Sequence, residues 1–220
     1  MKRKHIITIS GKPGSGKSST ADRVAELLGY TRYSSGDIVR TLIRKKRMTL
    51  SEYNQKASEN PKFDHHVDAE LRSLRDSNDI VIDARLGFYW IPESFKVYLW
   101  LNNEVAIARI YKDANNNASR SNVGESSVDM SDIFDQVEAR FRNEQQRFKK
   151  LYGIDPYDSS HFDLVIDTSR HSPHTVALAI FDIYKKWLAS DRWQQVSNKV
   201  PLGYSFKNDY QQNPPHMHEE

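Results

Sequence analysis

A glycine-rich loop near the start of the chain carries the residues with the clearest chemistry. It lies between an apolar run at residues 6–9 and a helix-like stretch at residues 20–28, the context that a phosphate-binding loop of the pattern G-x-x-x-x-G-K-[ST] requires. Glycines let backbone N–H groups turn toward phosphate oxygens, and the following helix N-terminus adds a partial positive charge. A turn that needs glycine for geometry alone is the alternative, but spacing and context favour a nucleoside triphosphate site. The expected nucleotide-binding residues are Gly11, Lys12, Pro13, Gly14, Ser15, Gly16, Lys17, Ser18 and Ser19.

This phosphate loop (residues 11–19) and one strand end supply the groups that phosphoryl transfer needs. Lys17 can reach the β- and γ-phosphates of a nucleotide, so we expect it to act in catalysis as well as in binding. The hydroxyl of Ser18 can ligate Mg²⁺. Asp83 ends the apolar run 80–83 where the loop should lie, so we expect it to hold the same ion, directly or through water. The alternative for Asp83 is a carboxylate that caps the following turn.

The arginines separate the classes of phosphate-loop protein. The chain has no Asn-Lys-x-Asp guanine reader and no apolar strand that ends in Asp-Glu, which disfavours a GTPase switch and a motor ATPase. Arginines instead follow strands and lie on helices, as transfer between two phosphates requires, because there the protein positions and neutralises charge. Arg140, Glu144 and Arg147 are spaced i, i+4, i+7 and share one helix face. The alternative for this set is an ion-paired, solvated face that contributes only tenths of a kcal/mol.

Strands alternate with helices along the chain, which predicts an α/β fold. We expect the three-layer P-loop fold, with a parallel sheet of about five strands covered by helices on both faces. The expected strands are 5–10, 30–33, 80–83, 95–101 and 163–167. The expected helices are 17–28, 38–46, a short one opened by Thr49, 62–77, 104–113, 131–150 and 173–187. The Asn- and Ser-rich run 114–127 predicts a mobile loop, and residues 191–220 predict a C-terminal tail that straps onto the body.

The composition of the chain limits which partners and which cellular compartment we expect for it. The chain has 220 residues, a net charge of +3 and no cysteine. The small charge does not favour a nucleic-acid partner, and the absence of thiols excludes disulfides and thiolate metal sites. No apolar run approaches the ~18 residues of a membrane span. We therefore expect a cytoplasmic monomer with no membrane and no nucleic-acid partner.

Several motifs resemble the nucleoside monophosphate kinases, and in particular the compact cytidylate kinases of archaea and some bacteria. The phosphate loop is general to the larger group. Residues 35–40, Ser-Gly-Asp-Ile-Val-Arg, are similar to the more specific Ser/Ala-Gly-Asp-x-x-Arg element of cytidylate kinases. The runs 48–53, 59–61, 67–68, 147–155 and 163–169 also match the compact form. The resemblance covers roughly residues 5–188.

The resemblance implies roles for the arginines. Arg40 and Arg85 are expected to hold the phosphate of an acceptor nucleotide, and Arg140 and Arg147 to clamp the phosphoryl group in transit. Arg109, on the expected helix 104–113, is expected to touch the donor nucleotide. The expected acceptor-binding residues are Ser35, Gly36, Asp37, Arg40, Arg85 and Glu144.

The resemblance also implies segments and a reaction. A kinase domain at 1–190 would contain an acceptor-binding segment at about 35–78 and a lid at about 112–130. The expected reaction is transfer of a phosphoryl group from ATP, with Mg²⁺, to CMP or dCMP. The alternatives are another small acceptor, such as AMP, shikimate or a nucleoside, and an ATP-binding module without turnover.

Two features leave the resemblance incomplete. Ala84 stands where the family usually has glycine before the arginine, which narrows the backbone freedom at that point. The insert with which larger bacterial cytidylate kinases read the base is absent, so the base-reading residues do not carry over. Asp37, Asp64 and Asp68 are the candidates that could accept from the exocyclic amine of cytosine.

Overall fold

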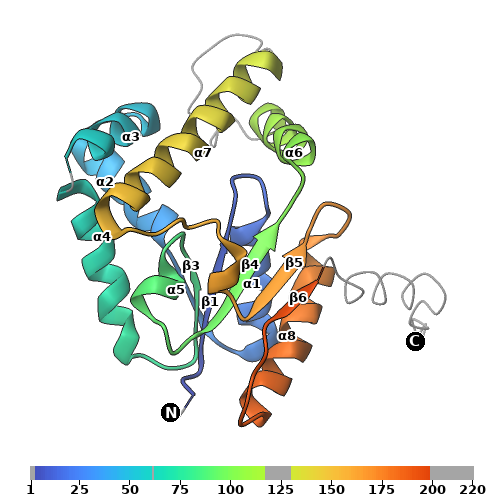
Figure 1. The fold of residues 1–220 in the computed structure, drawn as a ribbon. Coiled ribbons are helices and arrows are strands. Elements are labelled where there is room, and N and C mark those ends of the chain that lie inside the picture. Colours follow the sequence, from blue (N-terminus) through green and yellow to red (C-terminus); the bar gives the residue numbers. More distant parts are fainter. Residues whose placement is uncertain (1–2, 61, 117–129, 199–220) are drawn as a thin grey trace, which may run out of the picture.

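The computed structural model describes residues 3–60, 62–116 and 130–198 (Figure 1). Within these residues the centre of the molecule is a six-stranded sheet in the order β2-β3-β1-β4-β5-β6. Every neighbouring pair of strands is parallel. The strands are β1 (Ile6–Gly11), β2 (Thr31–Ser34), β3 (Ile80–Asp83), β4 (Phe95–Trp100), β5 (Leu164–Asp167) and β6 (Val196–Asn198).

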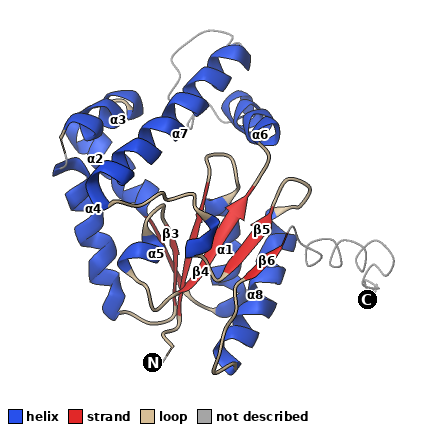
Figure 2. Ribbon diagram, in the orientation of Figure 1, coloured by secondary structure: helices blue, strands red, loops and turns tan. Residues whose placement is uncertain are grey.

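Helices cover both faces of the sheet, which gives the three layers that the sequence predicts (Figure 2). On one face α1 and α8 pack together and bury Val24 and Ile180 against Ile9 and Val97. On the other face, residues of α4 such as Leu71 pack on Ile82. The helices are α1 (Lys17–Leu28), α2 (Ser35–Lys46), α3 (Leu50–Glu59), α4 (Lys62–Ser73), α5 (Gly87–Trp90), α6 (Asn103–Asn116), α7 (Met130–Tyr152) and α8 (Pro173–Ala189).

The central strands are apolar because both of their faces are covered. All six residues of β1 are buried, and so are all four residues of β3. Strands buried on both faces read as continuous apolar runs rather than as alternating ones, which is why these two are evident in the sequence. The edge strand β2 is mostly exposed or half-buried and carries Arg32 and Tyr33.

A group of helices lies beyond the carboxyl ends of the strands, where the phosphate loop and the strand-end residues also lie. In Figure 1, α7 crosses this end of the molecule from α6 to the α2–α4 group, and it contacts both α6 and α3. The helix α3 starts at the capping box that the sequence predicts, in which Thr49 and Glu52 exchange hydrogen bonds. These helices bring distant parts of the chain onto the same edge of the sheet.

Several boundaries differ from the prediction. The helix α2 starts at Ser35 rather than Ile38, and α4 ends at Ser73 before a short 3-10 turn. The four-residue α5 has no periodic signal and was not expected. Residues 117–129, which include most of the expected loop and lid, lie outside the described residues.

The sixth strand comes from the part of the chain that the sequence indicates as tail. Three residues are too few to show a strand period, so the sequence gives no sign of β6. Trp193 packs near Phe95, and its Nε1–H donates to the carbonyl of Asp163 at 3.2 Å. Val196 donates its N–H to the same carbonyl at 2.9 Å. These contacts, made to residues far away in sequence, hold the segment at the edge of the sheet.

One negative finding concerns membranes. In residues 3–60, 62–116 and 130–198, no helix combines the length and the apolar composition that a membrane crossing requires.

Candidate active site

The phosphate loop connects β1 to α1 in a conformation that depends on glycine. Gly14 has φ of 77°, and a Cβ there would lie 2.8 Å from the carbonyl oxygen of Ala106. A side chain at this position is therefore excluded by both the backbone and its neighbour. The hydroxyl of Ser15 is buried without a hydrogen-bond partner in the described structure. A glycine cradle with a buried, unused donor fits a phosphate group.

Lys17 points back into this loop. Its Nζ donates to the carbonyl oxygens of Gly11 and Lys12, each at 2.8 Å. Burial lowers the pKa of Lys17 well below its usual range; the charge of Arg85 adds to this effect, and the charge of Asp83 opposes it. The ammonium group is thus buried beside charges of both signs, where its interaction with a phosphate would be strong.

A cleft of about 390 Å³ runs along the outer side of the loop. It is lined by residues 14–20 and by side chains that include Arg109, Thr168 and His171. Arg109 donates to the carbonyl oxygen of Thr168 at 2.7 Å, which anchors its guanidinium to the turn after β5. This position, beside the phosphate loop, is compatible with the expected contact to a donor nucleotide.

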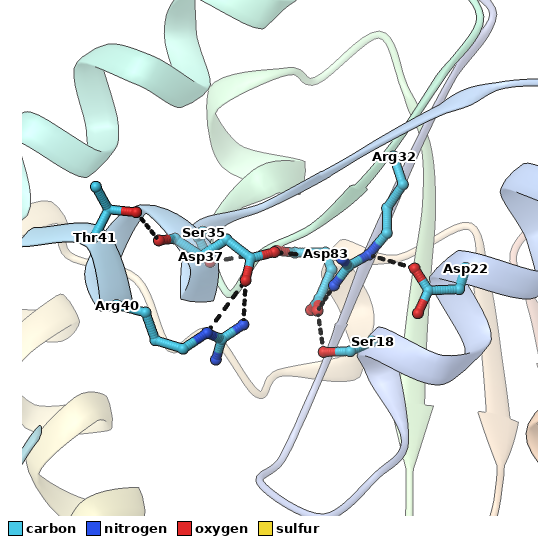
Figure 3. A network of polar contacts seen from close by, with 8 residues as sticks. All are labelled: Ser18, Asp22, Arg32, Ser35, Asp37, Arg40, Thr41 and Asp83. Atoms are coloured by element: carbon cyan, nitrogen blue, oxygen red, sulfur yellow. Dashed lines mark hydrogen bonds and ion pairs between the residues drawn. The ribbon is translucent and has the colours of Figure 1, made fainter. Parts of the chain in front are cut away.

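Ser18 and Asp83 meet at the end of the two central strands. The pairing of Ile9 with Asp83 in the β1–β3 register places the carboxylate next to the loop. The Ser18 hydroxyl donates to Asp83 Oδ2 at 2.6 Å (Figure 3). No cluster of three or more His, Cys, Asp or Glu side chains in the described residues could hold a metal. A hydroxyl and one carboxylate fit Mg²⁺, which usually completes its coordination with substrate phosphates and water.

The start of α2 brings four expected acceptor-binding residues to the same place. Ser35 donates its hydroxyl to the backbone carbonyl of Asp83 at 3.3 Å. Arg40 donates to Asp37 Oδ1 through Nε at 3.2 Å and through a terminal nitrogen at 2.6 Å. Burial raises the pKa of Asp37, but hydrogen bonding to Arg40 outweighs it and the pKa is lowered. A Cβ on Gly36 would lie 3.3 Å from the Arg40 guanidinium, so glycine leaves room for that group.

Sequence reasoning missed Arg32, which belongs to the same network. Its side chain extends from β2 to the carboxylates of Asp22, Asp37 and Asp83 (Figure 3). A charged residue in a short strand just before the Ser-Gly-Asp element was the available signal. The three contacts depend on β2 lying beside β3, which the local sequence does not reveal.

A second cluster surrounds the buried carboxylate of Glu144 on α7. Arg85 donates to Glu144 Oε2 at 2.7 Å, and Arg140 donates to Oε1 at 3.0 Å. The hydroxyl of Tyr157 donates to Oε2 at 2.7 Å. Burial raises the pKa of Glu144, but the charges of Arg85 and Arg140 outweigh it and hold the pKa well below its usual range. The glutamate is therefore an anion that positions two expected phosphate-binding arginines.

This burial excludes one of the alternatives for the α7 residues. The Glu144 side chain is 7% exposed and that of Arg147 is 8% exposed, so these two are not part of an ordinary solvated face. Tyr157 was missed as a site residue, although it lies only two residues after the run 147–155 that matches the compact form. Its hydroxyl reaches Glu144 only because the chain folds back after α7.

Arg147 does not join Arg140 at Glu144. Its Nε lies 3.2 Å from Asp64 Oδ2 in a buried ion pair that connects α7 to α4. Burial raises the pKa of Asp64 to about 6, although the Arg147 charge lowers it. Asp68, one turn further along α4, accepts from the indole N–H of Trp90 at 2.9 Å and from the Tyr152 hydroxyl. Both Asp68 oxygens are therefore engaged, and so are both oxygens of Asp37, through Arg40 and Arg32.

Ala84, which stands where the family usually has glycine, is accommodated without strain. Ala84 is 1% exposed and packs with Ile82 in the core on one face of the sheet. It is not among the residues with positive φ, so its backbone conformation does not require glycine. The alanine therefore introduces no backbone strain before Arg85.

The sequence and the fold were compared with known proteins. Residues 6–170 match the cytidylate kinase-like family. A cytidylate kinase of Thermoplasma acidophilum is 31% identical over 180 residues, which cover 79% of this chain and 89% of the relative. A cytidylate kinase of Halobacterium salinarum is 34% identical over 178 residues, which cover 80% of this chain and 88% of the relative.

Solved structures with a similar fold include two shikimate kinases. The enzyme from Acinetobacter baumannii, in complex with shikimate, superposes with a TM-score of 0.56 at 16% identity and covers 86% of this chain and 97% of its own. The enzyme from Bacteroides thetaiotaomicron has a TM-score of 0.55 at 11% identity, with 84% and 98% covered. At such low identity the likeness establishes the fold alone.

Proposed function

Because the chain belongs to the cytidylate kinase-like family, we propose that it transfers the γ-phosphoryl group of ATP to CMP or dCMP. The relatives that bear the name cytidylate kinase are matched over nearly their whole length, which supports a common reaction. The acceptor phosphate is already an anionic nucleophile, so the reaction requires neither a covalent intermediate nor a strong general base. The protein's task is to position two phosphates and to neutralise charge.

One observation carries the proposal. Hydrogen bonds connect the phosphate loop and its strand to the expected acceptor clamp: the Ser18 hydroxyl donates to Asp83, and Arg85, two residues later, donates to Glu144, which also accepts from Arg140. Apart from Ser18, these residues come from β3, the turn after it, and α7. The expected donor cradle and the expected acceptor clamp are therefore adjacent at one edge of the sheet, as direct transfer from one phosphate to another needs.

On the donor side, the phosphate loop would hold the ATP phosphates through backbone N–H groups and Lys17. Ser18 and Asp83 would hold Mg²⁺, which would supply positive charge next to the phosphates. Arg109 would contact the nucleotide from the far side of the cleft. Their positions support these roles: Lys17, Ser18 and Arg109 line one cleft, and Asp83 accepts a hydrogen bond from Ser18.

On the acceptor side, Arg40 and Arg85 would hold the monophosphate. A guanidinium matches the geometry of a phosphate with two parallel N–H donors, which an ammonium cannot do. Glu144 would keep Arg85 and Arg140 oriented, while Arg140 and Arg147 would respond to the charge of the phosphoryl group in transit. Ser35, Gly36 and Asp37 would lie near the acceptor, an assignment supported by their position around Arg40 and Asp83.

We further propose that the enzyme acts as a monomer on free nucleotides rather than on nucleic acid. The net charge of +3 is small for a protein that binds nucleic acid.

A coupled assay with ATP, Mg²⁺ and a panel of acceptors tests the proposal. The panel contains CMP, dCMP, UMP, AMP, GMP, shikimate and a free nucleoside, with ATP alone as the control for hydrolysis. We expect kcat/KM for CMP or dCMP to exceed that for every other acceptor. A stronger preference for shikimate, AMP or a nucleoside would replace the proposed acceptor. Binding of ATP without turnover of any acceptor would indicate a non-catalytic module.

A further inference from the structure

Arg32 lies where three structural elements meet. It projects from β2, and each of its nitrogens approaches a different carboxylate (Figure 3). Nε lies 3.1 Å from Asp22 of α1, one terminal nitrogen 3.3 Å from Asp37 of α2, and the other 3.4 Å from Asp83 of β3. The three nitrogens of a guanidinium are spread in a plane and can reach three separate carboxylates, whereas the three donors of a lysine ammonium all lie on one nitrogen.

The three contacts differ in strength. The side chains of Asp22 and Asp37 are 60% and 55% exposed, whereas that of Asp83 is 8% exposed. Exposed ion pairs contribute little because water and salt screen them, so the Asp83 contact dominates. Even so, 3.4 Å is long for a hydrogen bond to a charged group. Arg32 is thus held near Asp83 mainly by charge, and it can leave only when another cation takes its place beside the buried carboxylate.

Arg32 and Ser18 share one oxygen of Asp83. The Ser18 hydroxyl and an Arg32 nitrogen both approach Oδ2. This oxygen is adjacent to the other expected metal ligand, so a cation that binds Ser18 and Asp83 must compete with the guanidinium for it. Arg32 therefore lowers the affinity of this pair for a divalent cation as long as it stays on Asp83.

Asp37 connects Arg32 to the acceptor side. It accepts from Arg40 at 2.6 Å and from Arg32 at 3.3 Å. If Arg40 binds the acceptor phosphate, as the proposed function holds, Asp37 loses its stronger partner. Arg32 is the remaining cation within reach of that carboxylate, and it then moves toward Asp37 and away from Asp83.

We propose that Arg32 is a positioning residue that competes with Mg²⁺ for Asp83 and releases this carboxylate when an acceptor phosphate engages Arg40. The inference rests on the proposed function and deepens it. Acceptor binding then strengthens Mg²⁺ binding, and by reciprocity Mg²⁺ strengthens acceptor binding. The site completes its metal coordination only when both substrates are present.

Equilibrium binding tests this coupling without any turnover. Calorimetry on the full-length chain gives the Kd of β,γ-imido-ATP with Mg²⁺ and with EDTA, each in the absence and presence of saturating CMP. The ratio of the two Kd values measures how much Mg²⁺ tightens nucleotide binding. We expect CMP to increase this ratio about fivefold in the wild type, at the lower end of typical coupling between sites.

Two variants of Arg32 test separately the need for a positive charge and the need for a guanidinium that spans three carboxylates. In Arg32→Gln the cation is absent, so the ratio is high with and without CMP and the CMP effect disappears. In Arg32→Lys a cation remains but cannot span three carboxylates, so the CMP effect also disappears. The matched control is Arg23→Gln, which removes an exposed arginine of α1 that pairs only with Glu26 among the contacts described, and the CMP effect stays within twofold of wild type.

A third variant leaves Arg32 in place. Asp37→Asn removes the carboxylate that attracts Arg32 away from Asp83, so the ratio stays low with and without CMP. This variant carries the test if circular dichroism shows that both Arg32 variants are unfolded. A CMP effect that remains within twofold of wild type in Arg32→Gln, or in Asp37→Asn, overturns the proposal. The proposal is also overturned if, without CMP, the ratio of Kd values in Arg32→Gln is lower than that in the wild type.

The turnover assay separates this failure from failure of the proposed function. If the wild type phosphorylates CMP but Arg32→Gln behaves as wild type in calorimetry, only the role of Arg32 is wrong. If the wild type phosphorylates a different acceptor, the proposed substrate is wrong, and the calorimetry is carried out with that acceptor. A wild type that shows no CMP effect on the ratio, despite CMP turnover, also overturns the coupling.

Discussion

Several charged residues of this site are buried, and each has hydrogen-bond or ion-pair partners that stabilise its charge. Lys17 is surrounded by loop carbonyls, and Glu144 by two guanidinium groups and a phenol. A buried charge without such partners would be costly. The partners also limit where each group can point, which is what a phosphoryl-transfer site needs because its rate depends on position and preorganised charge.

Lys17→Ala should abolish turnover without unfolding the protein. The ammonium group is expected to stabilise charge that develops in the transition state, and loss of one such preorganised donor typically lowers kcat by about 10²–10³-fold. The coupled assay with CMP measures the loss, and thermal unfolding checks the fold. Lys186→Ala, which removes an exposed lysine of α8 paired with Asp182, is the control and should keep wild-type kinetics. Near-full turnover by Lys17→Ala would contradict the kinase assignment.

Arg40 and Arg140 should affect different kinetic constants. Arg40 is expected to hold the acceptor in both ground and transition states, so Arg40→Ala should raise KM for the monophosphate by about tenfold or more. Arg140 is expected to act as charge moves between phosphates, so Arg140→Ala should chiefly lower kcat, by up to ~10³-fold. Steady-state kinetics with varied CMP at saturating ATP separates the two. Equal changes in KM and kcat for both variants would remove this division of roles.

Among the elements, α7 connects the two sides of the site. Residues at i, i+4 and i+7 of its sequence share one face, and the structure turns that face inward. Glu144 pairs with Arg140 on the same helix and with Arg85 after β3, whereas Arg147 pairs with Asp64 on α4. The helix therefore links the strand-end site to the acceptor-binding segment through two separate buried ion pairs.

The Asp64–Arg147 pair should leave a signature in the dependence of stability on pH. The pKa of Asp64 is about 6 in the folded protein against 3.8 as its ordinary value. A raised folded pKa means that the folded state binds more protons between these values, so the contribution of Asp64 to stability is largest below about pH 4 and is lost as pH rises through about 6. A shift of about 2 pH units corresponds to about 3 kcal/mol.

Asp64→Asn tests this assignment because an amide does not titrate. The unfolding free energy of the wild type, relative to that of the variant, should fall by up to about 3 kcal/mol between pH 4 and pH 7. Urea unfolding at a series of pH values gives both curves. Asp182→Asn, at an exposed position of α8, should follow the wild-type curve. Parallel curves for wild type and Asp64→Asn would show that Asp64 titrates normally.

At the scale of the whole molecule, the parallel sheet determines where the chemistry lies. Because all strands run in one direction, the phosphate loop after β1, Asp83 at the end of β3 and the turn after β5 share one edge. Ligands of open α/β sheets bind at this carboxyl edge. The strand β6 lies at one lateral margin of the sheet, next to β5.

Trp193→Ala should weaken the fold without changing catalysis. Trp193 is half-buried against Phe95 and donates to the Asp163 carbonyl, so its removal should cost about 2 kcal/mol, less than a fully buried tryptophan. For a chain of this size we expect Tm to fall by about 4–8 °C. Trp193→Phe, which keeps a ring but loses the N–H donor, should lose less. An unchanged Tm in Trp193→Ala would show that β6 adds nothing to stability.

The sequence by itself determined the features that depend on neighbours along the chain. The phosphate loop is recognisable because its glycines, Lys17 and Ser18 act within nine consecutive residues. The face shared by Arg140, Glu144 and Arg147 follows from helix geometry, and the apolar runs of β1 and β3 follow from burial on both sides. Each of these signals is local, so the physics that produces it is visible in a short window of sequence.

Only the tertiary structure decided which of these side chains meet. Arg32 reaches Asp83 because β2 pairs with β3, and Tyr157 reaches Glu144 because the chain turns back after α7. Arg147 was expected to act beside Arg140, but its ion pair is with Asp64, 83 residues earlier in the chain. Such contacts form when packing brings distant segments together. The partner of a charged side chain is therefore one of the groups that the folded chain places within a few ångströms of it, and the sequence does not show which groups these are.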